Sequence, residues 1–131
     1  MKRLVATWRE NLIPHIRAHT QVHAEEEECY RSLFVELGGR RWVKAALVQQ
    51  AMAERIHGLD DTSARDIVAV VKKMVPRHSS DDGTEISWGA FVLCLRAASC
   101  VVAAGYDVDD LDFHEDLCSG VIALADLADT Y

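Results

Sequence analysis

The sequence predicts an all-α fold: a single domain over residues 1–131, built as a bundle of about six helices around a buried central helix. Six stretches carry apolar residues at helical spacing, and no stretch shows strand alternation or an internal repeat. Residues 86–105 are apolar on every side except at Arg96, and such a helix needs neighbours all around it. A membrane span is the alternative, but Arg96 and the many small residues favour a soluble domain.

Composition narrows the classes of protein. A chain of 131 residues with 50% apolar content can bury a core without disulfides or a metal. Its four cysteines form no CxxC pair, which fits a reducing, intracellular, cytoplasmic setting. A net charge of -7 argues against nucleic acid as a partner. We expect neither a secretion signal at the N-terminus nor a membrane anchor at the C-terminus.

Three helices are predicted in the first half of the chain. The stripe of the first, bent at Pro14, consists of Leu4, Val5, Trp8, Leu12 and Ile16. The second, over residues 25–37, has Tyr30, Leu33, Phe34 and Leu37. Gly38 and Gly39 end this helix. The stripe of the third, which closes near Gly58, consists of Trp42, Ala45, Val48, Met52 and Ile56.

Three more helices follow. The fourth, capped by Thr62 or Ser63 and ended by Pro76, has the stripe Ile67, Val70, Val71, Met74 and Val75. A polar loop over residues 77–85 leads to the central helix, which Thr84 or Ser87 can cap and Gly105 closes. The sixth stripe consists of Phe113, Leu117, Val121, Leu124 and Ala128.

The join between the fourth and central helices carries a family resemblance. Asp82-Gly83, followed by Ile86-Ser87-Trp88-Gly89 at the start of a buried helix, resembles the first homology motif of the Bcl-2 family, with Ser87 in place of its usual Asn. Residues 68–75 resemble the groove-lining fourth helix of that family, and residues 51–64 its third helix and loop. Phe34, Leu37 and Gly38 are placed like its third motif, although Gly39 stands where that motif has Asp.

Three departures from the family pattern are visible. Ala90 replaces the arginine that pairs with the aspartate of the ligand helix. Ala98 and Ser99 replace a pair of small residues, usually glycines, and keep the size class. The chain stops at Tyr131, before the last short helices and the hydrophobic tail of many members. It is most similar to the compact pro-survival versions encoded by large DNA viruses.

The resemblance implies an inhibitor of apoptosis that sequesters the amphipathic BH-3 helix of a death-promoting relative in an apolar groove; a pro-death member is the alternative. The implied groove residues are Met52, Ile56, Val70, Val71, Lys73, Met74, Trp88, Gly89, Ala90, Leu93 and Ala97. Lys73 is the expected substitute for the missing cation. Each stripe residue is as readily explained as core, and we expect Trp88 to pack against a neighbouring helix. A homodimer through or beside the groove would cover its apolar surface.

A metal site is the competing interpretation. His15, His19 and His23 are four residues apart, with Glu25–Glu28 close behind, and on one helix they could bind zinc or copper. Pro14 and an expected helix end near Thr20 argue against this. The acidic loop at residues 107–112 lacks the turn glycine of a calcium loop. No catalytic arrangement is recognisable, so we expect neither an enzyme nor a cofactor.

Overall fold

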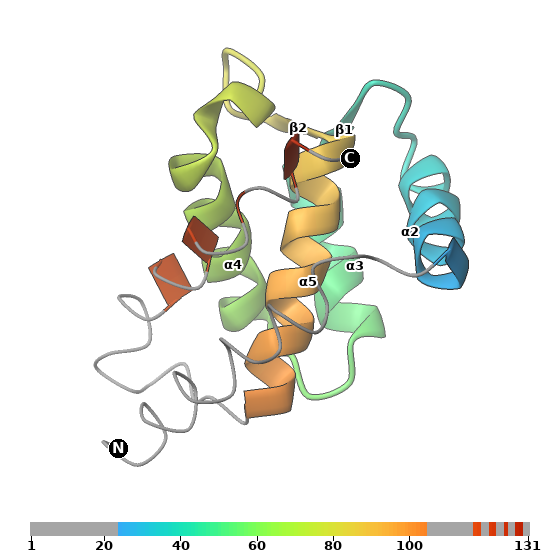
Figure 1. The fold of residues 1–131 in the computed structure, drawn as a ribbon, viewed down its shortest axis with the longest axis vertical. Helices are drawn as coiled ribbons and strands as arrows, with labels where there is room; N and C mark the ends of the chain where they lie inside the picture. Colours follow the sequence, from blue (N-terminus) through green and yellow to red (C-terminus); the bar gives the residue numbers. More distant parts are fainter. Residues whose placement is uncertain (1–23, 105–116, 119–120, 123–124, 126–127, 130–131) are drawn as a thin grey trace.

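The computed structural model describes residues 24–104, and after them 117–118, 121–122, 125 and 128–129. Its α-helices are α2 (Ala24–Glu36), α3 (Ala45–Arg55), α4 (Asp61–Met74) and α5 (Trp88–Ala104) (Figure 1). A short 3-10 helix, η1, spans Pro76–His78, and strands β1 (Trp42–Lys44) and β2 (Glu85–Ser87) form a small sheet. The predicted helical class is confirmed. The predicted first helix lies outside the described residues.

Helix α5 is the centre of the fold, as predicted. Every side chain from Ala90 to Ala98 is buried, and α2, α3 and α4 surround the helix (Figure 1). The buried Arg96 places its guanidinium 5.9 Å from the ring centroid of Tyr30 on α2. The predicted closing residue, Gly105, lies outside the described residues.

The end of α2 shows why two glycines follow it. Gly38 has a φ of 85°, which non-glycine residues rarely adopt. The N–H groups of Gly38 and Gly39 donate to the carbonyls of Val35 and Phe34, both at 2.9 Å, and so satisfy the last turn. A Cβ at Gly39 would lie 2.6 Å from the ring of Phe34. The predicted helix end is therefore confirmed.

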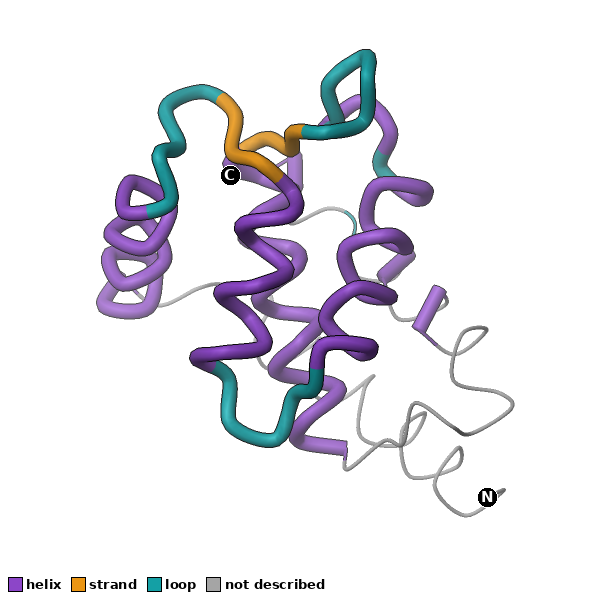
Figure 2. The backbone as a smooth tube through the Cα atoms, turned by 180° about the vertical axis from the view of Figure 1, so that it is seen from behind, coloured by secondary structure: helices purple, strands orange, loops and turns teal. Residues whose placement is uncertain are grey.

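The two-stranded sheet corrects the sequence analysis, which predicted no strands and began the third helix at Trp42. Residues 42–44 instead pair antiparallel with residues 85–87, with Val43 opposite Ile86. Both β-branched side chains are fully buried. Figure 2 shows the strands leading directly into α3 and α5. Three residues are too few for an alternating pattern to stand out in a sequence.

Helix α4 begins and ends close to the predicted positions, but its cap differs. Asp60, rather than Thr62 or Ser63, is the capping residue, and its carboxylate accepts a 2.7 Å hydrogen bond from the N–H of Ser63. This bond lowers the pKa of Asp60. The helix ends at Met74, and Pro76 opens η1, where a missing N–H costs nothing.

The last part of the chain contributes to the core. Leu117, Val121 and Ala128 are fully buried, as their predicted stripe requires. The other two members of that stripe, Phe113 and Leu124, lie outside the described residues. The packing of these three side chains joins the C-terminal segment to the same core as α5.

Candidate helix-binding surface

The turn between η1 and β2 is built around one carboxylate. Asp82 accepts hydrogen bonds from the hydroxyls of Ser80 and Thr84 and from the N–H of Thr84, at 2.7–3.0 Å. These donors, led by the Thr84 N–H, lower the pKa of Asp82 to about 2. Gly83 follows with a φ of 73°. The predicted polar loop thus contains a turn at Asp82-Gly83.

Ser87 opens α5. Its hydroxyl accepts a 3.2 Å hydrogen bond from the N–H of Ala90, the geometry of a helix cap. The same hydroxyl lies 2.7 Å from Nδ1 of His78. Of the two predicted caps, Ser87 is therefore the one used, because Thr84 is engaged by Asp82.

Trp88 packs between helices, as expected. Its ring meets Phe34 of α2 edge-on at 5.3 Å and stacks on Phe91 of α5 at 5.8 Å. The guanidinium of Arg31 lies 4.8 Å from the Trp88 ring centroid. Through these ring contacts, α2 packs against the beginning of α5.

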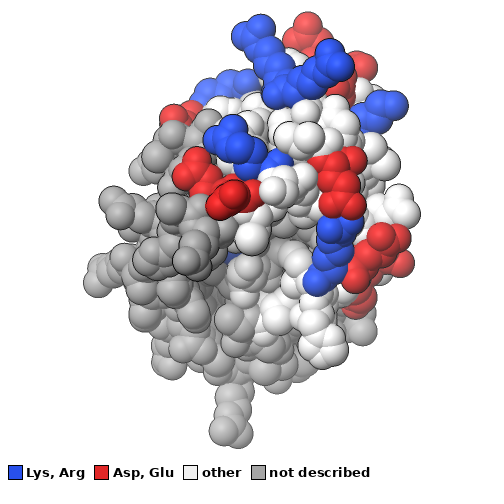
Figure 3. All heavy atoms as spheres, turned by 90° about the vertical axis from the view of Figure 1, so that its right-hand side faces the viewer, with Lys and Arg blue, Asp and Glu red and all other residues white. Residues whose placement is uncertain are grey.

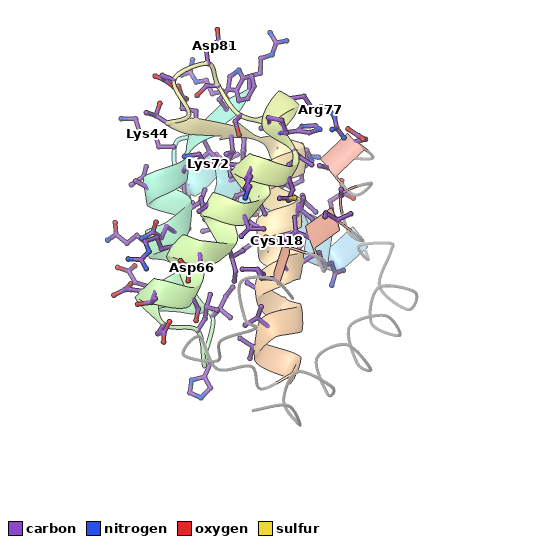
Figure 4. All side chains as sticks on the ribbon, turned by 90° about the vertical axis from the view of Figure 1, so that its left-hand side faces the viewer. Lys44, Asp66, Lys72, Arg77, Asp81 and Cys118 are labelled. Carbon is purple, nitrogen blue, oxygen red and sulfur yellow. The ribbon has the colours of Figure 1, made fainter. Side chains whose placement is uncertain are left out.

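At Gly89 the backbone of Ala128 lies against the beginning of α5. A Cβ at this position would collide with the backbone carbonyl of Ala128, so only glycine leaves enough room. Next to this contact, Nε of Arg77 donates to the carboxylate of Asp129 at 3.0 Å, and Nε2 of His78 lies 3.0 Å from it. The hydrogen bonds, first from Arg77 and then from His78, lower the pKa of Asp129 to about 2. Figure 4 shows Arg77 beside this segment.

Most of the predicted groove residues belong to the core. The buried ones are Met52, Val70, Val71, Gly89, Ala90, Leu93 and Ala97. Ile56, Met74 and Trp88 are partly buried against that core, and Lys73 is exposed. The apolar ones among them come from α3, the residue after it, α4 and α5, and they pack in or against one hydrophobic core. Their part in ligand binding stays a prediction.

A hollow of about 350 Å³ lies between α3 and α4, and we call it the α3–α4 hollow. Its lining residues are Ala45, Ala46, Gln49, Arg65, Val68, Ala69, Lys72, Gly83 and Thr84. The space exists because three of the lining residues are alanines and one is a glycine. The lining includes two cations, Arg65 and Lys72, and no acidic residue. Figure 4 views α4 from the side of Lys72. None of the predicted groove residues contributes, because the apolar stripe that revealed them marks the side facing the core.

Two further hollows lie along α2 and are chemically different. One, of about 490 Å³, includes Glu36 and Arg55, whose side chains form a 2.7 Å ion pair. The other, of about 460 Å³, is lined by Glu28, Arg31, Ser32 and Val35. Figure 3 shows acidic and basic side chains interspersed over the described part of this face. Both α2 hollows therefore mix the two signs of charge, unlike the α3–α4 hollow.

The competing metal interpretation is not addressed by these residues. His15, His19 and His23 lie outside the described part, as does the acidic loop at residues 107–112. Within the described part, no group of three histidine, cysteine or acidic side chains is arranged to hold a metal. Likewise, none of the helices described there has the length and apolar content needed to cross a membrane.

Comparison with known proteins gives no relative. No protein-family model, no curated protein and no solved structure matches this chain.

Proposed function

We propose that this protein is a Bcl-2-like helix-binding module that inhibits apoptosis by sequestering the BH-3 helix of death-promoting partners. The observation that carries the proposal is the α3–α4 hollow, a space of about 350 Å³ between two helices that both pack on the core. Grooves between helices are the surfaces that amphipathic helices recognise. The proposal implies an intracellular protein that needs no cofactor.

The order of elements before α5 supports the family part of the proposal. An amphipathic helix, an Asp82-Gly83 turn, a Ser87 cap and Trp88-Gly89 precede a helix buried on every side. These are the features on which the resemblance rests. The buried C-terminal stripe is also what a sixth bundle helix would contribute, so a Bcl-2-like bundle is the fold we propose for the whole chain.

The burial of the predicted groove residues sets a condition on binding. Met52 and Val71 are 1% and 0% exposed, so a ligand helix contacts them only if the elements that cover them move. The α3–α4 hollow is open without such a movement. We therefore place the first contact of the ligand helix there, with its apolar side chains against the exposed Ala46 and Ala69.

Titration of the protein with a panel of amphipathic BH-3 peptides, followed by fluorescence anisotropy, tests the proposal. We expect saturable binding by some peptides. Ala69→Trp fills the hollow from an exposed position and should abolish that binding while the protein stays folded. Arg41→Gln, at an exposed position outside the hollow, is the control and should bind like the wild type. The absence of saturable binding throughout the panel would contradict the function.

A further inference from the structure

The residues that line the α3–α4 hollow carry positive charge, whereas the protein as a whole is negatively charged. The chain has a net charge of -7, yet the lining residues include Arg65 and Lys72 and no acid. Arg65 lies 3.5 Å from the carboxylate of its neighbour Asp66, which does not line the hollow. For Lys72, the described residues provide no ion pair. Asp82 precedes the lining residue Gly83 and accepts hydrogen bonds from Ser80 and Thr84, and it does not line the hollow. The charges that line the hollow are therefore cationic, in an acidic protein, and this favours an acidic partner.

The two cations are seven residues apart on α4, so they lie on the same face. At 1.5 Å per residue, their backbones are separated by about 10.5 Å along the helix axis. A partner helix that lies along α4 matches this separation with two carboxylates that are also seven residues apart.

The wall between the cations is made of small side chains. Ala45 and Ala46 come from α3, and Val68 and Ala69 come from α4. A volume of about 350 Å³ is near the lower limit of small-molecule pockets, roughly 300–1,000 Å³. Such a space accepts the apolar side chains from one turn or two of a helix.

We propose that the α3–α4 hollow recognises a partner helix carrying two acidic residues seven positions apart, with large apolar residues on the same face between them. Lys72 and Arg65 bind the two carboxylates, and the alanines receive the apolar side chains. This proposal rests on the helix-binding function and specifies the chemistry of its partner. It also gives Lys72 the role that the sequence assigned to Lys73.

A designed amphipathic peptide helix provides the probe. It carries leucines along one face with Glu at positions i and i+7 on that face. One matched peptide has both Glu replaced by Gln, and another moves the second Glu to i+5, which turns it away from the face. We expect the i, i+7 peptide to bind at least fivefold more tightly than either matched peptide, and increasing salt should reduce the difference.

Protein variants locate the site. Lys72→Gln and Arg65→Gln should each weaken binding of the i, i+7 peptide about three- to fivefold and leave the Gln peptide unaffected. Arg41→Gln removes the same charge outside the hollow and should leave both affinities unchanged. Circular dichroism verifies that every variant is folded. Equal weakening by Arg41→Gln would show a general charge effect and overturn the proposal.

The remaining outcomes separate this proposal from the proposed function. Equal binding of all three peptides, still blocked by Ala69→Trp, keeps the helix-binding function and overturns the acidic specificity. If no peptide binds and the protein instead self-associates through a contact that Lys72→Gln weakens, the occupant is a second copy. That result overturns the inference about the partner.

Discussion

The beginning of α5 and the α3–α4 hollow use small residues for opposite purposes. At Gly89 the missing side chain lets the carbonyl of Ala128 approach, so the space is filled by the chain itself. At Ala45, Ala46 and Ala69 the small side chains leave about 350 Å³ open. A small residue thus indicates a binding surface only when no neighbouring segment occupies the space beside it.

The charges of the two regions differ in the same way. Arg77 and His78, beside the contact at Gly89, already bind the carboxylate of Asp129. Lys72, in the hollow, has no carboxylate partner in the described part of the chain. An acidic ligand at the first region must displace an internal carboxylate, whereas one at the hollow need not.

The largest loss of folding stability is expected from a substitution on the core side of α4. Val71→Glu places a charge where the side chain is 0% exposed, and we expect a loss of more than about 3 kcal/mol in the free energy of unfolding. Ala69→Glu, at an exposed position on the same helix, should change it by less than about 0.5 kcal/mol. Urea unfolding followed by circular dichroism measures both. A stable Val71→Glu protein that loses only peptide binding would restore Val71 to the groove.

Gly89→Ala tests the close contact between the beginning of α5 and the backbone of Ala128. The added methyl group meets the Ala128 backbone, which must shift, and overpacking of this kind costs about 1–3 kcal/mol. Alanine is the better helix former by about 1 kcal/mol, so a net loss shows that the contact dominates. Thermal unfolding gives the sign. Stabilisation by Gly89→Ala would mean that the C-terminal segment does not press on α5.

The sequence predicted the helical class and the central helix because both follow from periodicity. A helix that is apolar on every side except at Arg96 needs neighbours all around it, and Ala90–Ala98 are indeed buried. The strands at residues 42–44 and 85–87 were missed because the pairing of Val43 with Ile86 spans more than 40 residues. Only tertiary packing brings those two side chains together.

The hollow was missed for a different reason. Apolar periodicity identifies the side of α4 with Val70 and Val71, which is the side that packs inside. Ala69 and Lys72 lie on another side and give no apolar signal. The available signal was the pair Arg65 and Lys72, two cations on one helix face in an acidic chain.

Removing the cap of α5 should cause a moderate loss of folding stability. Ser87→Ala removes the acceptor for the Ala90 N–H and the partner of His78 Nδ1, and losing a cap costs about 1 kcal/mol. Thr84→Ala, which removes the other predicted cap, leaves both contacts in place and should cost less. Chemical unfolding of the two variants side by side makes the comparison. Equal losses would indicate that Ser87 does not act as the cap.

The smallest expected effect is at Asp129, whose contacts with Arg77 and His78 lie at the surface, where such pairs contribute little. The folded protein holds the pKa of Asp129 at about 2, below its ordinary 3.8, so the unfolded chain takes up the proton first as the pH falls. The stabilisation is therefore complete above about pH 4 and disappears as the pH falls toward 2.

Asp129→Asn lacks this contribution at every pH. We expect the stability of wild type and variant to differ at pH 5–7 and to converge near pH 2. Asp82 titrates in the same range in both proteins, so its contribution cancels in the difference. A difference that stays constant from pH 6 to pH 2 would show that Arg77 does not hold the carboxylate of Asp129. Other contacts would then have to hold the C-terminal segment beside Gly89.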